Sequence, residues 1–416
     1  MNVLWFVNVP LRGLLEEIPN LSRGSGWWLS ELASELVKVG VQLTVVTCLN
    51  SKKQVEVLRD GIRYIIVPAS PFEVSGIGGK QLLQRLANVV HIVLPDLIDC
   101  HGSEYIYGQI APSLHVPILV TIQGFINAVV DQPYGSNGFL TVLKSSLLQS
   151  NPVKSFSLMM SNHFLNKARA RSEMKVLNLN SFFSGRTDWD KTELARLAGE
   201  KIYFSAPRIL RKEFYQESWT GGSKESQSIF SCARAIPGKG FDDLIKVLPH
   251  ILNRFRSVRL RITCAERSAW GNHLARLARL LGVYDRVDFL GYLSSKEIIK
   301  ELKSSSAFAY SSYVDNSPNS LAEALCLGVP SVASNVGGIP SLITQGENGL
   351  LFPKGSLADL ADGINSVLSD ETLAKKLSTQ SRARALEVHD RSKVVSKVLK
   401  SYEFVRSIRP QAAIRK

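Results

Sequence analysis

Short apolar runs alternate with longer amphipathic segments along the first half of the chain. The pattern predicts helices at residues 27–39 and 80–90, a hairpin at 55–68, and strands at 2–9, 42–48, 96–100 and 117–122. Apolar runs of this length are typical of buried strands, and apolar residues spaced by 3.6 are typical of helices that cover a sheet. The alternation therefore predicts a parallel sheet with helices on both faces.

A second alternating series begins after a polar, Gly- and Ser-rich stretch at residues 219–227, which is typical of the end of a linker. It predicts helices at 241–255, 272–281 and 295–304 and strands at 228–233, 258–264, 286–291 and 307–312. A chain of 416 residues is long enough for two domains. We expect an N-terminal Rossmann-like domain at residues 1–206, a C-terminal one at 207–392, and a basic helix or tail at 393–416.

Composition limits the class of protein. The apolar fraction of 45% is that of a soluble globular protein, and no apolar run reaches the roughly 18 residues that would span a membrane. The N-terminus lacks a basic segment and stops at Pro10, so it predicts a buried strand and no signal peptide. The five cysteines and seven histidines show no metal-binding spacing, which predicts free thiols in a reducing cytoplasm and no metal site.

Positive charge concentrates near the C-terminus. Residues 375–416 hold 12 Lys and Arg against 3 Asp and Glu, which is most of the whole-chain net charge of +14. Val394, Val395, Val398 and Leu399 make this region amphipathic, so it fits either an anionic membrane surface or a helix that packs back on the first domain. The chain has no helix-turn-helix, zinc-finger or RNA-binding aromatic motif, which argues against nucleic acid.

Two carboxylates, Asp315 and Glu323, flank a turn-forming stretch in the second half of the chain. Ser317 is predicted to cap the following helix with Pro318 at its first position, and Gly328 is predicted to end it. The N–H groups at the helix start would point outward, where the helix dipole favours an anion such as a diphosphate. These N–H groups belong to Asn319, Ser320 and Leu321.

Upstream, a loop carries two cations between a predicted strand and a predicted helix. Arg234 can donate two hydrogen bonds to a phosphate group, and Lys239 supplies a second charge on the same loop. A loop in this place is the phosphate site of a doubly wound sheet. Taken alone, the two residues are also compatible with solvated surface cations.

Together these motifs, with the Gly-rich segments 328–340 and 346–352, resemble the retaining glycosyltransferases of family 4, which have the GT-B fold of two Rossmann-like domains facing a cleft. The resemblance is strong over residues 228–370. It implies that a sugar moves from a nucleoside diphosphate donor to a saccharide or lipid-linked saccharide acceptor, with retention and without metal or other cofactor. We also expect a role in cell-surface polysaccharide synthesis, in the cytoplasm or peripherally at the inner face of the membrane.

The resemblance implies a role for each residue of the motif. Arg234 and Lys239 would hold the diphosphate, Asp315 would contact the donor sugar, and Glu323 would hold the ribose. Gly338 would also belong to the donor site.

The N-terminal half resembles the family more loosely. In the loop at residues 22–28, Gly26 would let the backbone approach the donor, and Trp27 and Trp28 would stack on an acceptor sugar, with core packing as the alternative. His101, after a predicted strand, is an acceptor candidate for which a structural role is the alternative. Arg186, at a predicted helix start capped by Thr187, is the other acceptor candidate.

Three positions depart from the family pattern. Asp315 replaces the usual Glu and is one methylene shorter at the donor sugar, and residues 263–266 replace a Gly-x-Gly turn near the nucleotide. Gln123 stands where many members have a His, and an amide can bind a sugar or leaving oxygen but cannot titrate. A nucleotide-sugar epimerase, a phosphorylase and a non-catalytic sugar-binding partner of a polysaccharide assembly complex therefore remain alternatives.

The sequence Asp188-Trp189-Asp190 matches the metal-binding D-x-D motif of a different glycosyltransferase fold. These acids fall in the predicted first turn of a helix, where the dipole alone favours them. We therefore predict no metal there.

Overall fold

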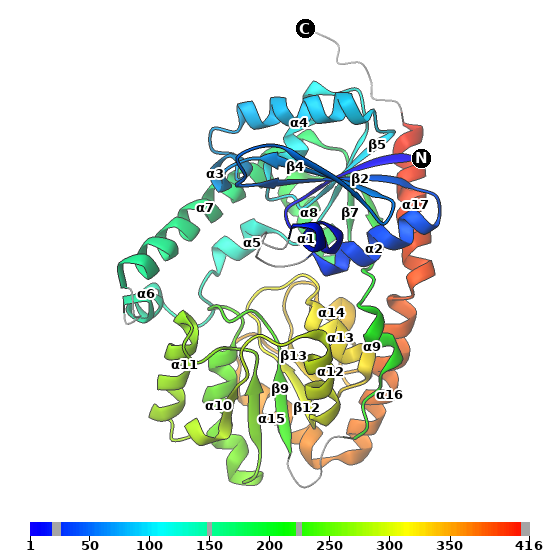
Figure 1. Cartoon of the computed structure of the whole chain (residues 1–416). Helices are drawn as coiled ribbons and strands as arrows, with labels where there is room; N and C mark the ends of the chain where they lie inside the picture. Colours follow the sequence, from blue (N-terminus) through cyan, green and yellow to red (C-terminus); the bar gives the residue numbers. More distant parts are fainter. Residues whose placement is uncertain (19–25, 148–151, 222–226, 409–416) are drawn as a thin grey trace. The chain divides into compact units, whose positions relative to one another are not determined.

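The computed structural model of the chain describes residues 1–18, 26–147, 152–221 and 227–408 and comprises two compact units (Figure 1). Unit 1 contains Met1–Val130, His163–Arg211 and His389–Lys416, and unit 2 contains Asp131–Asn162 and Lys212–Val388. The chain therefore passes from unit 1 to unit 2 twice and returns twice.

Unit 1 is built on an eight-stranded sheet with the order β3-β4-β2-β1-β5-β6-β7-β8. Its neighbouring strands pair in parallel except β3 and β4, which form the antiparallel hairpin predicted from the sequence. The strands are β1 (Asn2–Val7), β2 (Gln42–Leu49), β3 (Val55–Arg59), β4 (Ile62–Pro68), β5 (Leu97–His101), β6 (Ile118–Thr121), β7 (Phe182–Gly185) and β8 (Ile202–Ser205).

Helices cover both faces of this sheet because successive side chains of a strand point to opposite sides. Trp5 in β1 packs with α1, α2 and α17, whereas Phe6 packs with α4, η1, the end of α7 and α8. The helices are α1 (Arg12–Glu17), α2 (Trp27–Lys38), α3 (Pro71–Val74), α4 (Lys80–Val93), η1 (Ile106–Ser113), α5 (Ile126–Asp131), α8 (Asp188–Ala198), α17 (Arg391–Ser407) and the part of α7 (Pro152–Leu179) that begins at His163. The predicted sheet with helices on both faces is confirmed.

Unit 2 is built on a six-stranded parallel sheet with the order β11-β10-β9-β12-β13-β14. The strands are β9 (Ser228–Ser231), β10 (Arg259–Ile262), β11 (Val287–Phe289), β12 (Ala307–Tyr310), β13 (Ser331–Ser334) and β14 (Leu350–Phe352). Its main apolar core lies between the sheet and α10, α11, α15 and α16, while α12 and α13 also pack against the strands. This second parallel sheet is the one predicted from the second alternating series.

In unit 2 the predicted helices correspond to α10, α11, α12 and α13 of the helices given next. The helices of this unit are α6 (Phe139–Leu147), α9 (Lys212–Gln216), α10 (Phe241–Arg254), α11 (Ala269–Leu280), η2 (Tyr284–Arg286), α12 (Ser295–Ser304), α13 (Asn319–Leu327), α14 (Ile339–Leu342), α15 (Leu357–Ser369) and α16 (Glu371–Val388). The polar stretch interpreted as the end of a linker falls partly at residues 222–226, outside the described residues.

The segment 131–162 belongs to unit 2 although it lies between two strands of unit 1. The sequence placed all of residues 1–206 in one domain and the basic tail from residue 393. In the structure Val142 of α6 is buried in the core of unit 2, and α6 packs on α11. The final segment that joins unit 1 begins at His389.

The C-terminal helix α17 uses its apolar face inside unit 1. Val394, Val395 and Val398 are buried in the same cluster as β1 and α2, and Leu399 packs against that cluster. Of the two interpretations that the sequence left open, the structure thus shows the packing of this helix on the first domain. The apolar face of α17, which would enter a membrane if the helix were an anchor, is therefore covered by β1 and α2 of unit 1.

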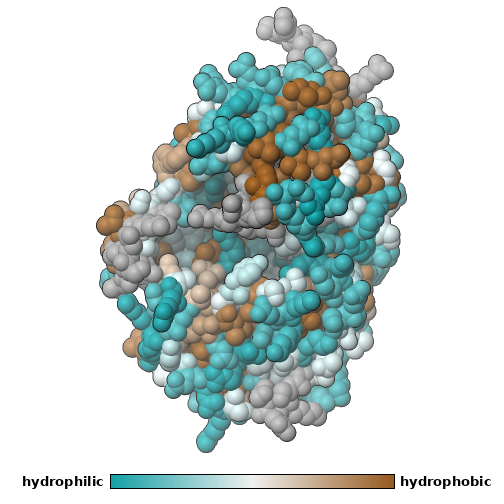
Figure 2. All heavy atoms as spheres, in the orientation of Figure 1, coloured by the Kyte–Doolittle hydropathy of each residue, from teal (hydrophilic) through white to brown (hydrophobic). Residues whose placement is uncertain are grey.

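No helix in the described ranges is long and apolar enough to cross a membrane. On the face drawn in Figure 2, hydrophilic residues cover most of the visible surface and hydrophobic residues show as patches between them.

Candidate active site

The loop between β9 and α10 places the two predicted phosphate cations at the carboxyl edge of the sheet of unit 2. Ligands of doubly wound sheets bind at this edge. Gly238 and Gly240 have φ angles of +84° and +75°, a left-handed backbone that favours glycine. A Cβ on Gly240 would lie 2.0 Å from the carbonyl oxygen of Ser311. Glycine is therefore required for the loop shape that carries Arg234 and Lys239.

Lys239 and Asp315 are in direct contact. Lys239 Nζ donates to Asp315 Oδ2 at 2.5 Å, and the Tyr310 hydroxyl donates to the same oxygen at 2.6 Å. The Lys239 and Asp315 side chains are only 21% and 16% exposed. Burial raises the pKa of Tyr310 well above its usual value, so its hydroxyl remains a donor at neutral pH. Arg234, on the same loop as Lys239, has an exposed side chain.

The start of α13 differs by one residue from the prediction. Pro318, not Ser317, occupies the N-cap position, because its ψ of 127° is extended and the helix begins at Asn319. The prediction that Ser317 caps this helix is wrong. No side chain accepts a hydrogen bond at this cap, so the N–H groups of Asn319, Ser320 and Leu321 suit an anion.

The rest of α13 matches the sequence prediction. Glu323 lies within the helix and is 1% exposed, and Gly328 ends it with a φ of +81°. The Gly338 N–H donates to the backbone oxygen of Asp315 at 3.1 Å. Gly338 thus supports the loop that presents Asp315.

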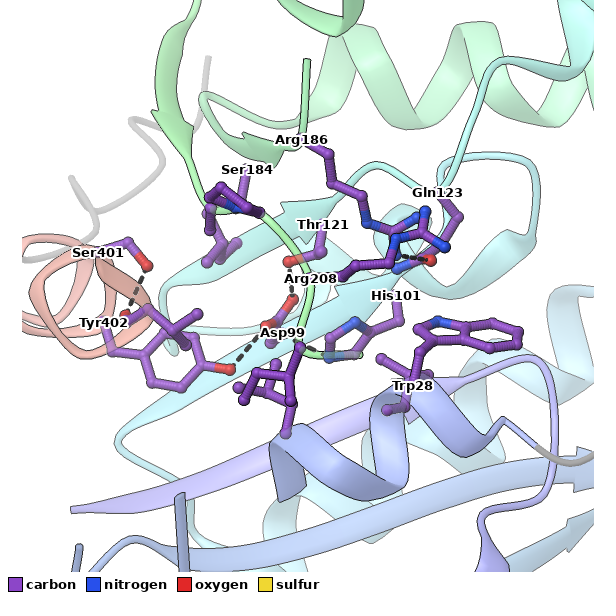
Figure 3. Close-up of a pocket in the computed structure, with 17 residues that line it drawn as sticks. Trp28, Asp99, His101, Thr121, Gln123, Ser184, Arg186, Arg208, Ser401 and Tyr402 are labelled. Atoms are coloured by element: carbon purple, nitrogen blue, oxygen red, sulfur yellow. Dashed lines mark hydrogen bonds and ion pairs between the residues drawn. The ribbon is translucent and has the colours of Figure 1, made fainter. Parts of the chain in front are cut away.

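A pocket in unit 1 collects four residues that the sequence assigned to catalysis or to the acceptor (Figure 3). It lies at the carboxyl ends of β5, β6 and β7 and has a volume of about 30 Å³. Trp28, His101, Gln123 and Arg186 line it, and Arg186 donates a hydrogen bond to Gln123 Oε1. The fold therefore brings together four residues from four separate segments, whereas Arg234, Lys239, Asp315 and Glu323 lie in unit 2.

Asp99 organises one wall of this pocket. Its carboxylate accepts hydrogen bonds from Thr121 Oγ1 and from the Tyr402 hydroxyl, both at 2.7 Å. Tyr402 in turn accepts from Trp5 Nε1 at 2.9 Å. His101 Nε2 lies 3.4 Å from Asp99 Oδ2. The C-terminal helix α17 is thereby connected to the wall that carries His101.

His101 is 1% exposed, and its ring packs edge-on against Trp5 at a centroid distance of 4.4 Å. Burial lowers the pKa of His101, which favours the neutral ring. This setting fits the structural role that the sequence left open as the alternative. Neither ring nitrogen has a hydrogen-bond partner in the described part of the chain.

Trp27 and Gly26, the other two residues predicted at this site, precede Trp28 in the sequence but do not line the pocket. The guanidinium of Arg211 sits 4.8 Å from the centre of the Trp27 ring. Gly26 precedes α2, and a Cβ there would lie 2.6 Å from Val9 Cγ2. The remainder of this Gly-rich loop, residues 19–25, is outside the described residues.

The acids of the D-x-D match lie in the first turn of α8, as predicted. Thr187 caps the helix, and the Asp190 carboxylate accepts from the backbone N–H groups of Arg186 and Thr187 at 2.7 and 3.1 Å. The capping box explains the acid at this position without a metal.

Sequence reasoning missed four residues at these two places. Tyr310 holds Asp315, and Asp99, Arg208 and Tyr402 line the pocket of unit 1. Asp99 and Tyr402 are separated by 303 positions. No local pattern in the sequence indicates such a pairing.

Comparison with known proteins finds a family model that matches much of the second half of the chain. The model "Glycosyl transferases group 1" matches residues 216–384. An uncharacterized glycosyltransferase of Haemophilus influenzae is 27% identical over 159 residues, which cover 38% of this chain and 44% of that protein. A D-inositol 3-phosphate glycosyltransferase of Mycolicibacterium smegmatis is 30% identical over 144 residues, which cover 34% and 33%. The chain thus spans less than half the length of these two relatives.

Solved structures extend the likeness to the whole fold. Sucrose-phosphate synthase of Thermosynechococcus elongatus is similar with a TM-score of 0.74 at 15% identity, covering 98% of this chain and 99% of that one. Anabaena HepE, in complex with UDP and glucose, has a TM-score of 0.69 at 16% identity, covering 97% and 100%. The chain therefore has the GT-B fold, and its residues 216–384 match the model of the glycosyl transferases group 1.

Proposed function

We propose that the protein is a retaining glycosyltransferase of the family 4 type that uses a nucleoside diphosphate sugar as donor. The acceptor would be a saccharide or lipid-linked saccharide used in cell-surface polysaccharide synthesis in the cytoplasm. The observation that carries the proposal is the contact between Lys239 and Asp315, on the loop that also carries Arg234. The Anabaena structure named for its complex with UDP and glucose supports a nucleotide donor on this fold.

The chemistry of the donor site follows from its charges. In the reaction the bond between the anomeric carbon and the diphosphate oxygen breaks, and negative charge grows on the leaving diphosphate. Arg234, Lys239 and the first turn of α13 present positive charge and N–H donors to that group, which is the kind of electrostatic stabilisation that contributes most to such reactions. The acceptor oxygen forms the new glycosidic bond, and its proton leaves with the nucleoside diphosphate.

The two carboxylates are expected to act at different ends of the donor. Glu323 would accept hydrogen bonds from the ribose, and Asp315 from the transferred sugar. Glu323→Ala should therefore weaken nucleoside diphosphate binding by roughly tenfold or more, since a hydrogen bond to a charged group contributes about 1.5–3 kcal/mol. Asp315→Ala should lower turnover far more than nucleotide affinity. Titration of UDP, GDP and ADP, followed by kinetics with the matching sugars, measures both effects.

Two results would contradict these roles. Unchanged nucleotide affinity in Glu323→Ala would remove Glu323 from the donor site. An equal loss of affinity and turnover in Asp315→Ala would remove Asp315 from the sugar. Failure of the wild-type chain to hydrolyse or transfer any donor that it binds would favour a non-catalytic sugar-binding protein.

Transfer is expected to need no divalent metal. Arg234 and Lys239 already supply the positive charge that a metal would bring to the diphosphate, and Asp190 is engaged in the cap of α8. Activity should persist in excess EDTA, and Asp188→Asn with Asp190→Asn should leave donor affinity unchanged. Loss of activity in EDTA with recovery on added manganese or magnesium would overturn this prediction.

A further inference from the structure

Several buried hydrogen-bond donors in the pocket of unit 1 have no acceptor among the described residues. Gln123 Oε1 already accepts from Arg186, and its amide Nε2 has no partner among the described residues. Trp28 Nε1 likewise has none there, and an indole N–H can only donate. In the buried His101, Nε2 lies 3.4 Å from Asp99 Oδ2, and Nδ1 has no hydrogen-bond partner within that part of the chain. Unpaired buried donors cost free energy, so a ligand that fits this pocket brings acceptor atoms.

The charged groups around the pocket favour a negative ligand. Arg186 and Arg208 both line it. Burial lowers the pKa of Arg186 to about 10, which leaves it charged at neutral pH. The Asp99 carboxylate in the lining accepts at both oxygens from neighbouring hydroxyl groups. Asp190, the other acid close to Arg186, accepts from backbone N–H groups in the cap of α8.

We propose that this pocket binds an anionic group, a carboxylate or a phosphate ester, on the sugar that accepts the transferred residue. A volume of about 30 Å³ holds about two waters or the charged end of a larger molecule. The sugar itself would therefore stay outside while its anionic group enters. A guanidinium pairs well with carboxylate and phosphate oxygens because it donates in a planar fork. That the bound sugar is the acceptor of the transfer rests on the proposed function, but binding of an anion in unit 1 does not require the donor.

Three sugars of the same ring but different charge test the proposal on the full chain by calorimetric titration. Glucose, glucuronate and glucose 6-phosphate serve as neutral, carboxylate and phosphate probes. We expect wild type to bind at least one charged sugar about tenfold or more tightly than glucose. The better charged probe identifies the anion.

Two variants of the pocket and one control locate the binding. Arg186→Gln removes the charge, and Gln123→Glu places a carboxylate against Arg186, so both should abolish the preference for the charged sugar. Arg196→Gln removes an equal charge from the exposed side of α8 and should keep the preference. A thermal melt of each variant shows that it is folded. If Arg186→Gln does not fold, Gln123→Glu alone decides.

The inference is overturned if wild type binds the three sugars equally or not at all, which would mean that the pocket holds water only. It is also overturned if folded Arg186→Gln or Gln123→Glu keeps the preference. Nucleoside diphosphate titration of the same proteins separates the two proposals. Absence of nucleotide binding by wild type refutes the proposed function, whereas nucleotide binding without charged-sugar binding refutes this inference alone.

Discussion

A donor that binds the site of unit 2 would have to compete with the ion pair between Lys239 and Asp315. Partly exposed pairs of this kind contribute on the order of 1 kcal/mol or less. A diphosphate offers the ammonium more negative charge and more acceptor oxygens than one carboxylate does. Donor binding is therefore expected to replace Asp315 at Lys239 and to release the carboxylate for a sugar hydroxyl, while Tyr310 keeps Asp315 in place.

Ionisation of Glu104 in unit 1 should lower the free energy of unfolding near neutral pH. Its Oε1 accepts from Asn8 Nδ2 at 3.2 Å, and its Oε2 has no partner among the described residues. Burial, with the neighbouring carboxylate of Glu173, raises the pKa of Glu104 from 4.5 to about 7. The folded chain thus holds this proton more tightly than the unfolded chain. The resulting stabilisation is complete below about pH 4.5 and is lost as the pH rises to about 7.

Glu104→Gln should therefore raise the free energy of unfolding at about pH 8, by on the order of 1–3 kcal/mol, and should give little gain at about pH 4.5. Urea denaturation at the two pH values measures the difference. Glu200→Gln, at an exposed position of the same unit, is the matched control and should show no such pH dependence. An equal gain at both pH values would show that Glu104 is not destabilised by its charge.

At the scale of elements, the segment that precedes α6 supports the phosphate-binding loop. A Cβ on Gly135 would lie 2.8 Å from the Tyr313 ring and 2.9 Å from Gly238 Cα. Ser136 Oγ donates to Asp242 Oδ2 at 3.1 Å, and the Tyr313 N–H donates to the oxygen of Gly238 at 2.9 Å. Gly238 is therefore held between Tyr313 and a segment that departs from the sheet of unit 1.

Gly135→Ala should weaken nucleoside diphosphate binding about fivefold or more, because its φ of +63° and the close contact with Gly238 leave no room for a methyl group. Gly138→Ala, three residues along the same segment, is the control, since a Cβ there meets nothing within 4 Å. Titration of the nucleotide on folded proteins measures both. Equal affinities in the two variants would show that the segment does not position the loop.

For the whole molecule, the features that could be predicted from sequence are those set by local chemistry. The period of apolar residues predicted a parallel sheet in each half of the chain, without the strands β7, β8, β13 and β14, and Thr187 predicted the start of α8. Pro318 was predicted as the first helical residue but is the N-cap. Its ring fixes φ but leaves ψ free, so the residue can be extended just before the helix. The membership of Val142 in unit 2 depends on contacts between distant segments, as does the bond from Tyr402 to Asp99. Such contacts leave no periodic signal in a single sequence.

The route of the chain also makes unit 1 depend on its last helix. The chain completes unit 2 at Val388 and returns to unit 1 for α17. Val398 of α17 is 7% exposed and packs in the same cluster as β1 and α2, whereas the neighbouring Lys397 is exposed. Unit 2 has a separate apolar core. A polar substitution on the inner face of α17 should therefore lower the stability of unit 1 and leave that of unit 2 unchanged.

Val398→Asp should lower the free energy of unfolding of unit 1 by roughly 3–5 kcal/mol, because it buries an unpaired charge. Lys397→Asp, one position away on the outer face, should change it by less than about 1 kcal/mol. Calorimetry should show a lower unfolding temperature for one transition in Val398→Asp, while nucleoside diphosphate binding by unit 2 persists. If α17 instead served as a membrane anchor, Val398→Asp would fold like wild type and lose binding to anionic vesicles. That result would refute the structural role of the helix.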